Sequence, residues 1–195
     1  MILTAEMLQE RLQEYSDRNG KIKRMKNNGE LFPLLRGLYE TDSNVPGYLL
    51  AGAIYGPSYL SFDYVLSRYE MIPEAVYTYT SATCGKKKMK EYENCFGRFF
   101  YRDIPPEVFP FGIVIHEENG YFYRMATPEK ALCDKLYTMP PVQSQREIEK
   151  MLFEDLRVDE TMFDRLDIAG IIGICEKYGS NNLKYFMKYL GRSRK

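Results

Sequence analysis

The stretch GKIKRMKNNGELFPLLRGLY, from Gly20 to Tyr39, decides how this chain is interpreted. A short basic segment with the pattern of a helix runs into Gly29, and two strand-like runs follow it, Leu31 to Leu35 and Gly37 to Glu40. A helix followed directly by a β-hairpin is the order in which a winged helix-turn-helix presents its recognition helix and its wing. We therefore expect a small winged domain at the start of the chain.

The charge of this stretch points in the same direction. From Arg18 to Arg36 there are six basic residues and one acid, Glu30, although the formal net charge of the whole chain is zero. Nucleic-acid binding depends first on local positive charge that meets phosphates, so the segment marks a possible docking site. A solvated helix face next to an ordinary hairpin would explain the same charges, and charge alone does not separate the two interpretations.

The composition of the chain limits the class of protein to which it can belong. With 195 residues, 45% hydrophobic and 28% charged, the chain has the composition of an ordinary globular protein. No apolar run approaches the ~20 residues that cross a bilayer, and no signal peptide is recognisable, so we expect a cytoplasmic protein without a membrane partner. The cysteines at 84, 95, 133 and 175 form no Cys-x-x-Cys pair, and His116 is the single histidine. We expect no metal site, and buried thiols at Cys133 and Cys175.

The first domain is predicted to span residues 1–43. A helix over residues 4–16 begins with Thr4 as its N-cap, Asn19-Gly20 is read as a turn, and Lys21 to Asn28 form the second helix. The segment DSNVPG, Asp42 to Gly47, has the composition of a linker.

An α+β domain with a small mixed sheet is predicted over residues 46–140. Helices are expected at Tyr48 to Tyr55 and after Ser61 as N-cap, and Thr127-Pro128-Glu129 begins another. Asn119-Gly120 is read as a type I′ hairpin turn. The expected strands are Ala75 to Thr80, Cys95 to Arg102, Phe111 to His116 and Tyr121 to Met125.

Residues 141–195 are predicted to be a helical extension packed on that domain. Between Arg146 and Asp167 there are eight acids and four bases, which suit either a partner surface or a plain solvated face. The chain ends in the basic tail Gly191 to Lys195, which we expect to be frayed and solvated.

Candidate chemistry is sparse. A metal-dependent nuclease would need carboxylates and a lysine that converge on one ion. The residues available for it are Glu129, Lys130, Asp134, Lys135 and Asp103. Lys130 and Asp134 are spaced i, i+4, which is also an ordinary helix-stabilising pair. The run Lys86-Lys87-Lys88 is a second basic patch, expected in a loop, that could hold backbone phosphate. The many tyrosines suit a tyrosine-rich core or a stacking platform for single-stranded bases.

Several motifs together resemble the AbiEi-type antitoxins and regulators of type IV toxin–antitoxin systems. They are KIKRMKNNGELFPLLRGLY, GPSYLSFDYVLSRYEMIPE, TSAT, FGRFFYRDIP and MATPEKALCDKLY, in the order of the family, between residues 20 and 138. The chain differs from the family in two respects. Two helices precede the hairpin where three are usual, and Phe32-Pro33-Leu34 stands where basic wing residues are expected.

The resemblance implies a non-enzymatic protein without cofactors. Its winged domain would bind double-stranded DNA at the promoter of its own operon, and its second domain would counter a nucleotidyltransferase-like toxin. The residues that match the recognition helix are Lys21, Lys23, Arg24 and Lys26, and Arg36 matches the wing. Lys86, Lys87 and Lys88 are possible auxiliary phosphate contacts. The alternatives are a protein- or RNA-interaction module with a degenerate winged domain, and a metal-dependent nuclease.

Overall fold

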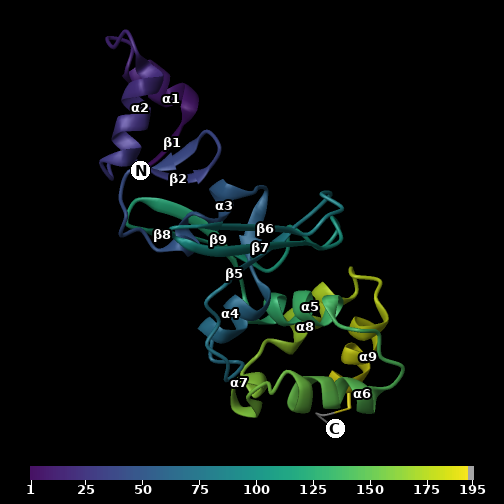
Figure 1. Ribbon diagram of the computed structural model, residues 1–195. Coiled ribbons are helices and arrows are strands. Elements are labelled where there is room, and N and C mark those ends of the chain that lie inside the picture. The colour runs from purple at the N-terminus through teal and green to yellow at the C-terminus, as the bar shows by residue number, and fades with distance from the viewer. Residues whose placement is uncertain (193–195) are drawn as a thin grey trace.

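The computed structural model describes residues 1–192 and shows an α+β fold arranged in layers (Figure 1). A small N-terminal unit lies at one end, a six-stranded sheet lies in the middle, and most helices lie at the other end. The predicted basic tail falls, from Ser193 on, outside the described residues. Within residues 1–192, no helix is both long and apolar enough to cross a lipid bilayer.

The N-terminal unit, residues 1–43, combines two helices with a three-stranded antiparallel sheet. In chain order its elements are β1 (Ile2–Thr4), α1 (Ala5–Arg11), α2 (Arg18–Asn27), β2 (Phe32–Leu35) and β3 (Leu38–Glu40). The strand order is β1-β3-β2. The hairpin β2–β3 matches the sequence prediction, whereas β1 was missed, because three residues carry too little periodicity to be recognised.

Each helix of this unit differs from the prediction at one end: α1 ends earlier than predicted, and α2 begins earlier. Thr4 is the N-cap of α1 as expected, and its Oγ1 accepts a hydrogen bond from the Met7 N–H at 3.2 Å, but the helix ends at Arg11. Helix α2 begins at Arg18, because the Asp17 side chain accepts a hydrogen bond from the Gly20 N–H at 2.8 Å. The interpretation of Asn19-Gly20 as a turn was therefore wrong; the pair lies in the first turn of α2.

The unit has a hydrophobic cluster of its own, formed by Leu3, Leu8, Leu12, Ile22 and Leu31. Strand β2, however, packs against the rest of the chain, residues 46–192, which we call the main domain. Leu34 is buried in the large hydrophobic cluster of that domain, and the Phe32 ring meets the Phe96 ring edge-on, with centroids 6.2 Å apart. The Asn94 amide donates to the Leu34 carbonyl oxygen at 3.2 Å. The apolar residues found where basic wing residues were expected thus dock the hairpin on the rest of the chain.

The large sheet is mixed, as predicted, but has six strands instead of about four. They are β4 (Ser58–Leu60), β5 (Tyr79–Thr83), β6 (Lys90–Asn94), β7 (Gly97–Asp103), β8 (Ile113–Glu118) and β9 (Tyr121–Ala126). Their order is β6-β7-β5-β4-β9-β8; the pairs β4–β9 and β5–β7 are parallel and the others antiparallel. Strands β4 and β6 were not predicted, and β5 begins at Tyr79, later than expected.

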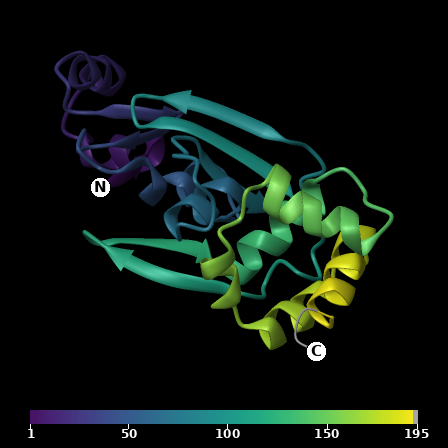
Figure 2. The same cartoon turned by 90° about the horizontal axis from the view of Figure 1, so that it is seen from below.

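The two edges of the sheet are formed by the hairpins β6–β7 and β8–β9. Figure 2 shows β6–β7 and β8–β9 reaching toward the N-terminal unit, with the segment around α3 between them. Asn119 and Gly120 form the turn of β8–β9 with φ of 52° and 77°, as the Asn-Gly dipeptide predicts.

Some helices pack on the sheet, and the helices after Pro140 pack beyond it at the end of the molecule away from the N-terminal unit (Figure 1). The helices are the 3₁₀-helix η1 (Gly47–Leu49), α3 (Ala51–Ile54), α4 (Phe62–Arg68), α5 (Pro128–Thr138), α6 (Gln145–Lys150), the π-helix η2 (Met151–Asp155), α7 (Glu160–Asp164), α8 (Ile168–Cys175) and α9 (Asn181–Leu190). Helix α5 begins as predicted, with Thr127 Oγ1 accepting from the Lys130 N–H at 3.3 Å. Residues from Val142 to Leu190 share one hydrophobic cluster with the sheet, so the helical extension has no core of its own.

Gly47, at the end of the predicted linker, is expected to tolerate no side chain. A Cβ at this position would lie 2.3 Å from Tyr79 Cε2 and 2.5 Å from the Phe96 carbonyl oxygen. Because one of these neighbours is backbone, Gly47→Ala should lower the free energy of unfolding by about 1–3 kcal/mol, as overpacking does. Urea denaturation followed by circular dichroism measures the change. Gly52→Ala is the matched control, since nothing lies within 4 Å of its added Cβ.

Candidate nucleic-acid interface

Helix α2 presents one side to the core of the N-terminal unit and the other to solvent. Ile22 is buried and Met25 is half-buried, which fixes the inner side. At about 100° per residue, Lys23, Asn27 and Arg24 lie roughly 100–200° around the helix from Ile22. All three are exposed. Two of the predicted DNA-binding residues, Lys23 and Arg24, therefore lie on the outer side of α2, with Asn27 beside them.

The other predicted residues of α2 lie on its flanks. Lys21 is half-buried, and its ammonium group lies 5.5 Å from the centroid of the Tyr15 ring. Lys26 is exposed on the opposite flank. The Arg24 guanidinium is 4.0 Å from the Asp17 carboxylate, and both side chains are more than half exposed. Such a surface pair contributes little energy, so Arg24 remains available to a ligand.

None of the acids of residues 1–43 lies within α2, although Asp17 caps its start beside Arg24 and Glu30 follows its end. Glu6 and Glu10 lie on α1, and Glu14 and Asp17 lie in the segment between α1 and α2. Hydrogen bonds from its own backbone N–H and from Thr4 lower the pKa of Glu6, which keeps that carboxylate ionised. Positive charge is therefore concentrated on α2, and α2 is the side of the unit that suits a phosphate backbone.

Arg36 lies in the turn between β2 and β3 and is exposed. The turn is fixed by Gly37, which has a φ of 83° and whose carbonyl oxygen accepts from the Ala5 N–H at 2.8 Å. Arg36 thus sits at the tip of a hairpin anchored to the start of α1. In the described residues, no contact joins Arg36 to the basic side chains of α2.

The lysine run predicted as an auxiliary phosphate contact lies between β5 and β6, in a loop as expected. The Lys86 ammonium lies 5.2 Å from the Tyr55 ring centroid. The Lys87 N–H donates to Asp103 Oδ2 at 2.5 Å, and Lys87 has a φ of 58°. Lys88 is exposed. The loop precedes β6, whereas Asn94, which contacts the hairpin β2–β3, ends that strand, so Lys86 to Lys88 form a patch separate from α2.

The residues considered for a nuclease are dispersed. Glu129 accepts from the Asp167 N–H at 3.2 Å, and Asp103 accepts from Thr83 Oγ1 at 2.6 Å. Lys135 pairs with Asp63 at 2.7 Å. Among the described residues, no group of three or more potential metal ligands comes together. These carboxylates do not meet at one point, so the geometry lends no support to a nuclease centre.

Lys130 and Asp134 form a fully buried ion pair, with the Lys130 ammonium 3.0 Å from Asp134 Oδ1. Lys130 also donates to Tyr178 Oη at 2.7 Å, and Tyr178 in turn donates to Asp134. The other carboxylate oxygen accepts from Tyr59 Oη at 2.9 Å and from Ser61 Oγ at 2.6 Å. The sequence predicted an ordinary helical pair at these positions. The structure shows a polar network that joins β4, α5 and the segment after α8.

This network is closed to ligands. Burial, followed by the nearby Asp134 carboxylate, raises the pKa of both Tyr59 and Tyr178, so both hydroxyl groups remain protonated donors. Gly112 packs so closely on Lys130 that a Cβ there would lie 2.7 Å from Lys130 Cβ. Ser61 occupies the N-cap position of α4 as predicted, but its side chain does not cap the helix and bonds Asp134 instead. The network joins β4, α5 and the segment after α8 within the protein interior.

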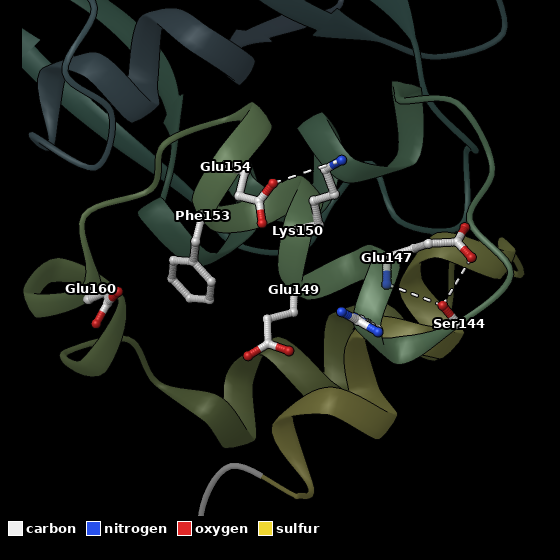
Figure 3. A pocket seen from close by; sticks show the side chains of 8 residues that line it. Ser144, Glu147, Glu149, Lys150, Phe153, Glu154 and Glu160 are labelled. Carbon is white, nitrogen blue, oxygen red and sulfur yellow. Dashed lines mark hydrogen bonds and ion pairs between the residues drawn. The ribbon is translucent and has the colours of Figure 1, made fainter.

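The acidic region after Pro140 forms a surface hollow of about 660 Å³ between α6, η2 and α7 (Figure 3). The Phe153 ring lies among Glu149, Glu154 and Glu160 (Figure 3). One of the acids in this hollow is already paired, since the Lys150 ammonium lies 3.8 Å from the Glu154 carboxylate. Ser144 Oγ lies 3.0 Å from Glu147, which it helps to position at the start of α6. The hollow is an open, charged helix surface without convergent catalytic groups.

Comparisons with known proteins identify a similar fold but give no information on activity. No protein-family model matches the chain, and no curated protein matches its sequence. Among solved structures, the RV2827C protein from Mycobacterium tuberculosis has a similar fold, with a TM-score of 0.60 and 11% sequence identity. The likeness covers 98% of this chain and 72% of that one. At this identity the likeness establishes a shared α+β architecture alone.

Sequence reasoning missed one member of the exposed surface of α2. Asn27 was given no role within the helix predicted from Lys21 to Asn28, although its i, i+4 spacing from Lys23 places the two side chains on one side. Applying that spacing outward from Lys23, instead of inward from Ile22, would have identified it. An asparagine side chain offers a donor and an acceptor side by side, which is the pair of groups that an adenine edge requires.

Proposed function

We propose that the chain is a DNA-binding transcriptional regulator and antitoxin of the AbiE type, non-enzymatic, that represses its own operon and counters a nucleotidyltransferase-like toxin. The single observation that supports DNA binding best is the outer side of α2, where Lys23, Arg24 and Asn27 are exposed together. Cations with a bidentate amide are the side chains that contact phosphates and base edges in a major groove.

The order of the elements supports the same proposal. Two helices lie between β1 and the hairpin β2–β3, and β1 pairs with β3. A helix directly followed by a β-hairpin is also found in winged helices, in which the helix before the hairpin reads DNA, although two helices stand here where three are usual. In this proposal α2 enters the major groove, and Arg36, at the tip of the hairpin, contacts the adjacent backbone. The Lys86 to Lys88 loop would contact phosphate only if the DNA extended beyond the N-terminal unit.

The test is binding of the full chain to the double-stranded DNA upstream of its own gene, measured by fluorescence anisotropy with a scrambled duplex as competitor. The proposal expects the upstream duplex to bind more tightly than the scrambled one, because base contacts add to the phosphate contacts that both share. Equal binding of both would leave only non-specific affinity. Absence of binding would favour the second candidate.

That second candidate is a protein- or RNA-interaction module whose winged domain no longer reads DNA. The observation that favours it is β2, because Phe32 and Leu34 are used against the main domain and leave the hairpin without a basic strand. A hairpin held in this way has fewer groups to offer to DNA than a free basic wing.

Alanine substitutions on α2 distinguish base reading from phosphate contact. If Lys23 or Arg24 reads a base edge, Lys23→Ala or Arg24→Ala should cost about 1–3 kcal/mol of binding free energy and relax specificity. If the side chain meets only phosphate, the loss should be the same for all sequences, and the salt slope should become shallower by about 0.9. Anisotropy at several salt concentrations measures both quantities. Lys184→Ala, on the exposed side of α9, should change neither.

A further inference from the structure

Side chains of α3 and of the β8–β9 hairpin line a groove. Figure 2 shows this hairpin and the β6–β7 hairpin on opposite sides of the segment around α3. The groove consists of two hollows of about 440 and about 630 Å³ that share Gly52 and Phe122 in their walls. One hollow extends to Pro57 and Ser58, and the other reaches Ile2 of the N-terminal unit. We refer to both together as the α3–hairpin groove.

The walls of this groove expose large apolar side chains. Phe122 is 71% exposed and Ile115 is 65% exposed. The pairs Glu117–Phe122 and Ile115–Arg124 stand opposite each other in the hairpin, so all four side chains share one face. The opposite face is occupied, since Tyr123 is buried there and stacks with His116 at 5.1 Å between ring centroids. The face with Ile115 and Phe122 is therefore an apolar surface that the chain itself leaves open.

The charged side chain that lines the groove is positive. Arg124 is exposed and, of the side chains that line the two hollows, it alone is charged. Within residues 1–192 it makes no ion pair and no hydrogen bond through its side chain. Glu117 lies nearby on the same face but does not line either hollow. A ligand that fills the groove would place apolar groups on both sides of Phe122 and a negative charge at Arg124.

We propose that the α3–hairpin groove binds a short segment of a partner protein that carries apolar side chains and a carboxylate. The apolar side chains fill the hollows on both sides of Phe122, and the carboxylate pairs with Arg124. A second copy of this chain is the competing occupant, because its exposed Glu117 would bring a carboxylate to the same face, and the oligomeric state separates the two cases. The proposal is independent of DNA binding, because no residue of α2 lines the groove.

Two short synthetic peptides with blocked ends test this proposal. Both alternate Leu and Ser; one carries a central Asp and the other carries Lys at the same position. Binding is measured by anisotropy of the labelled peptides and is located by the amide shifts of Gly52, Phe122 and Arg124 in the ¹⁵N-labelled full chain. The acidic peptide should bind at least about tenfold more tightly than the basic one and shift these amides, because unlike charges meet at Arg124 and like charges are penalised.

Charge reversal provides the decisive comparison. Arg124→Glu should reverse the preference, so that the Lys peptide binds more tightly, and Phe122→Ser should weaken both peptides. Arg98→Glu, on β7 and also well exposed, should leave the preference unchanged. The variant Lys23→Glu with Arg24→Glu should bind the peptides like the wild type, so a failure of DNA binding and a failure of this proposal are told apart.

Three results with the peptides would overturn the proposal: equal binding of both peptides, no amide shifts at the groove up to the solubility limit of the acidic peptide, or an unchanged preference in a folded Arg124→Glu protein. A dimer in sedimentation velocity that Phe122→Ser dissociates would also overturn it, because the groove would then be occupied by a second copy.

Discussion

Reversing the charge of Lys23 and Arg24 together is expected to abolish specific DNA binding. Both side chains are exposed on the outer side of α2, and Glu at both positions would turn two attractive contacts into repulsion from the phosphates. If each position contributes about 1–3 kcal/mol, the combined loss is on the order of 100-fold or more in affinity. Anisotropy with the upstream duplex measures it.

The fold should not change with this substitution. Exposed positions away from packing contacts usually alter stability by less than about 0.5 kcal/mol, so the circular dichroism spectrum and the urea midpoint should match those of the wild type. Lys184→Glu with Lys188→Glu is the matched control, because it makes the same charge change on the exposed side of α9. Equal losses in both variants would point to net charge instead of to α2.

Removal of the buried cation is expected to destabilise the protein more than any surface substitution. In Lys130→Met, Asp134 would keep its hydroxyl donors but would lose the positive charge 3.0 Å away in a site without exposure to solvent. Breaking a buried pair from one side typically costs about 3–5 kcal/mol. Urea denaturation should show that loss as a lower midpoint with an unchanged slope.

A matched lysine, Lys135, stands five residues further along the same helix. Lys135 pairs with Asp63 near the surface, with 19% and 35% of the two side chains exposed, so Lys135→Met should cost less than about 1 kcal/mol. The double variant Lys130→Met with Asp134→Asn should recover much of the loss, because no uncompensated charge remains. A Lys130→Met protein as stable as Lys135→Met would show that the network is not what joins β4 to α5.

The sequence predicted best those elements whose signals are local. Thr127-Pro128 and Asn119-Gly120 placed the start of α5 and the turn of β8–β9, because a cap and a positive φ are properties of adjacent residues. The short strand β4 and the polar strand β6, with sequence KEYEN, carried no apolar alternation and were missed. Their places are set by pairing with β5 and β7, which no local pattern encodes.

Contacts between distant residues escaped prediction for the same reason. The partners of Asp134 include Tyr59 and Tyr178, which lie 75 and 44 residues away along the chain. The sequence showed only the i, i+4 spacing of Lys130 and Asp134, which suits a solvated pair equally well. Likewise Phe32 and Leu34 read as a weakened wing, and only the packing against Phe96 shows that they hold the hairpin to the main domain. Lys23, Arg24 and Lys26 were predicted to point away from the core because that depends on helical geometry alone, whereas Asn27 beside them was missed.

The salt dependence of binding to the upstream duplex tests the central proposal most directly. If Lys21, Lys23, Arg24, Lys26 and Arg36 all meet phosphates, the logarithm of the association constant should fall against the logarithm of salt concentration with a slope of roughly −4 to −5. Lys23→Ala with Arg24→Ala should make that slope shallower by about 2. Specific binding whose slope is the same in the wild type and in this variant would contradict the account, because the DNA would then be held by another surface.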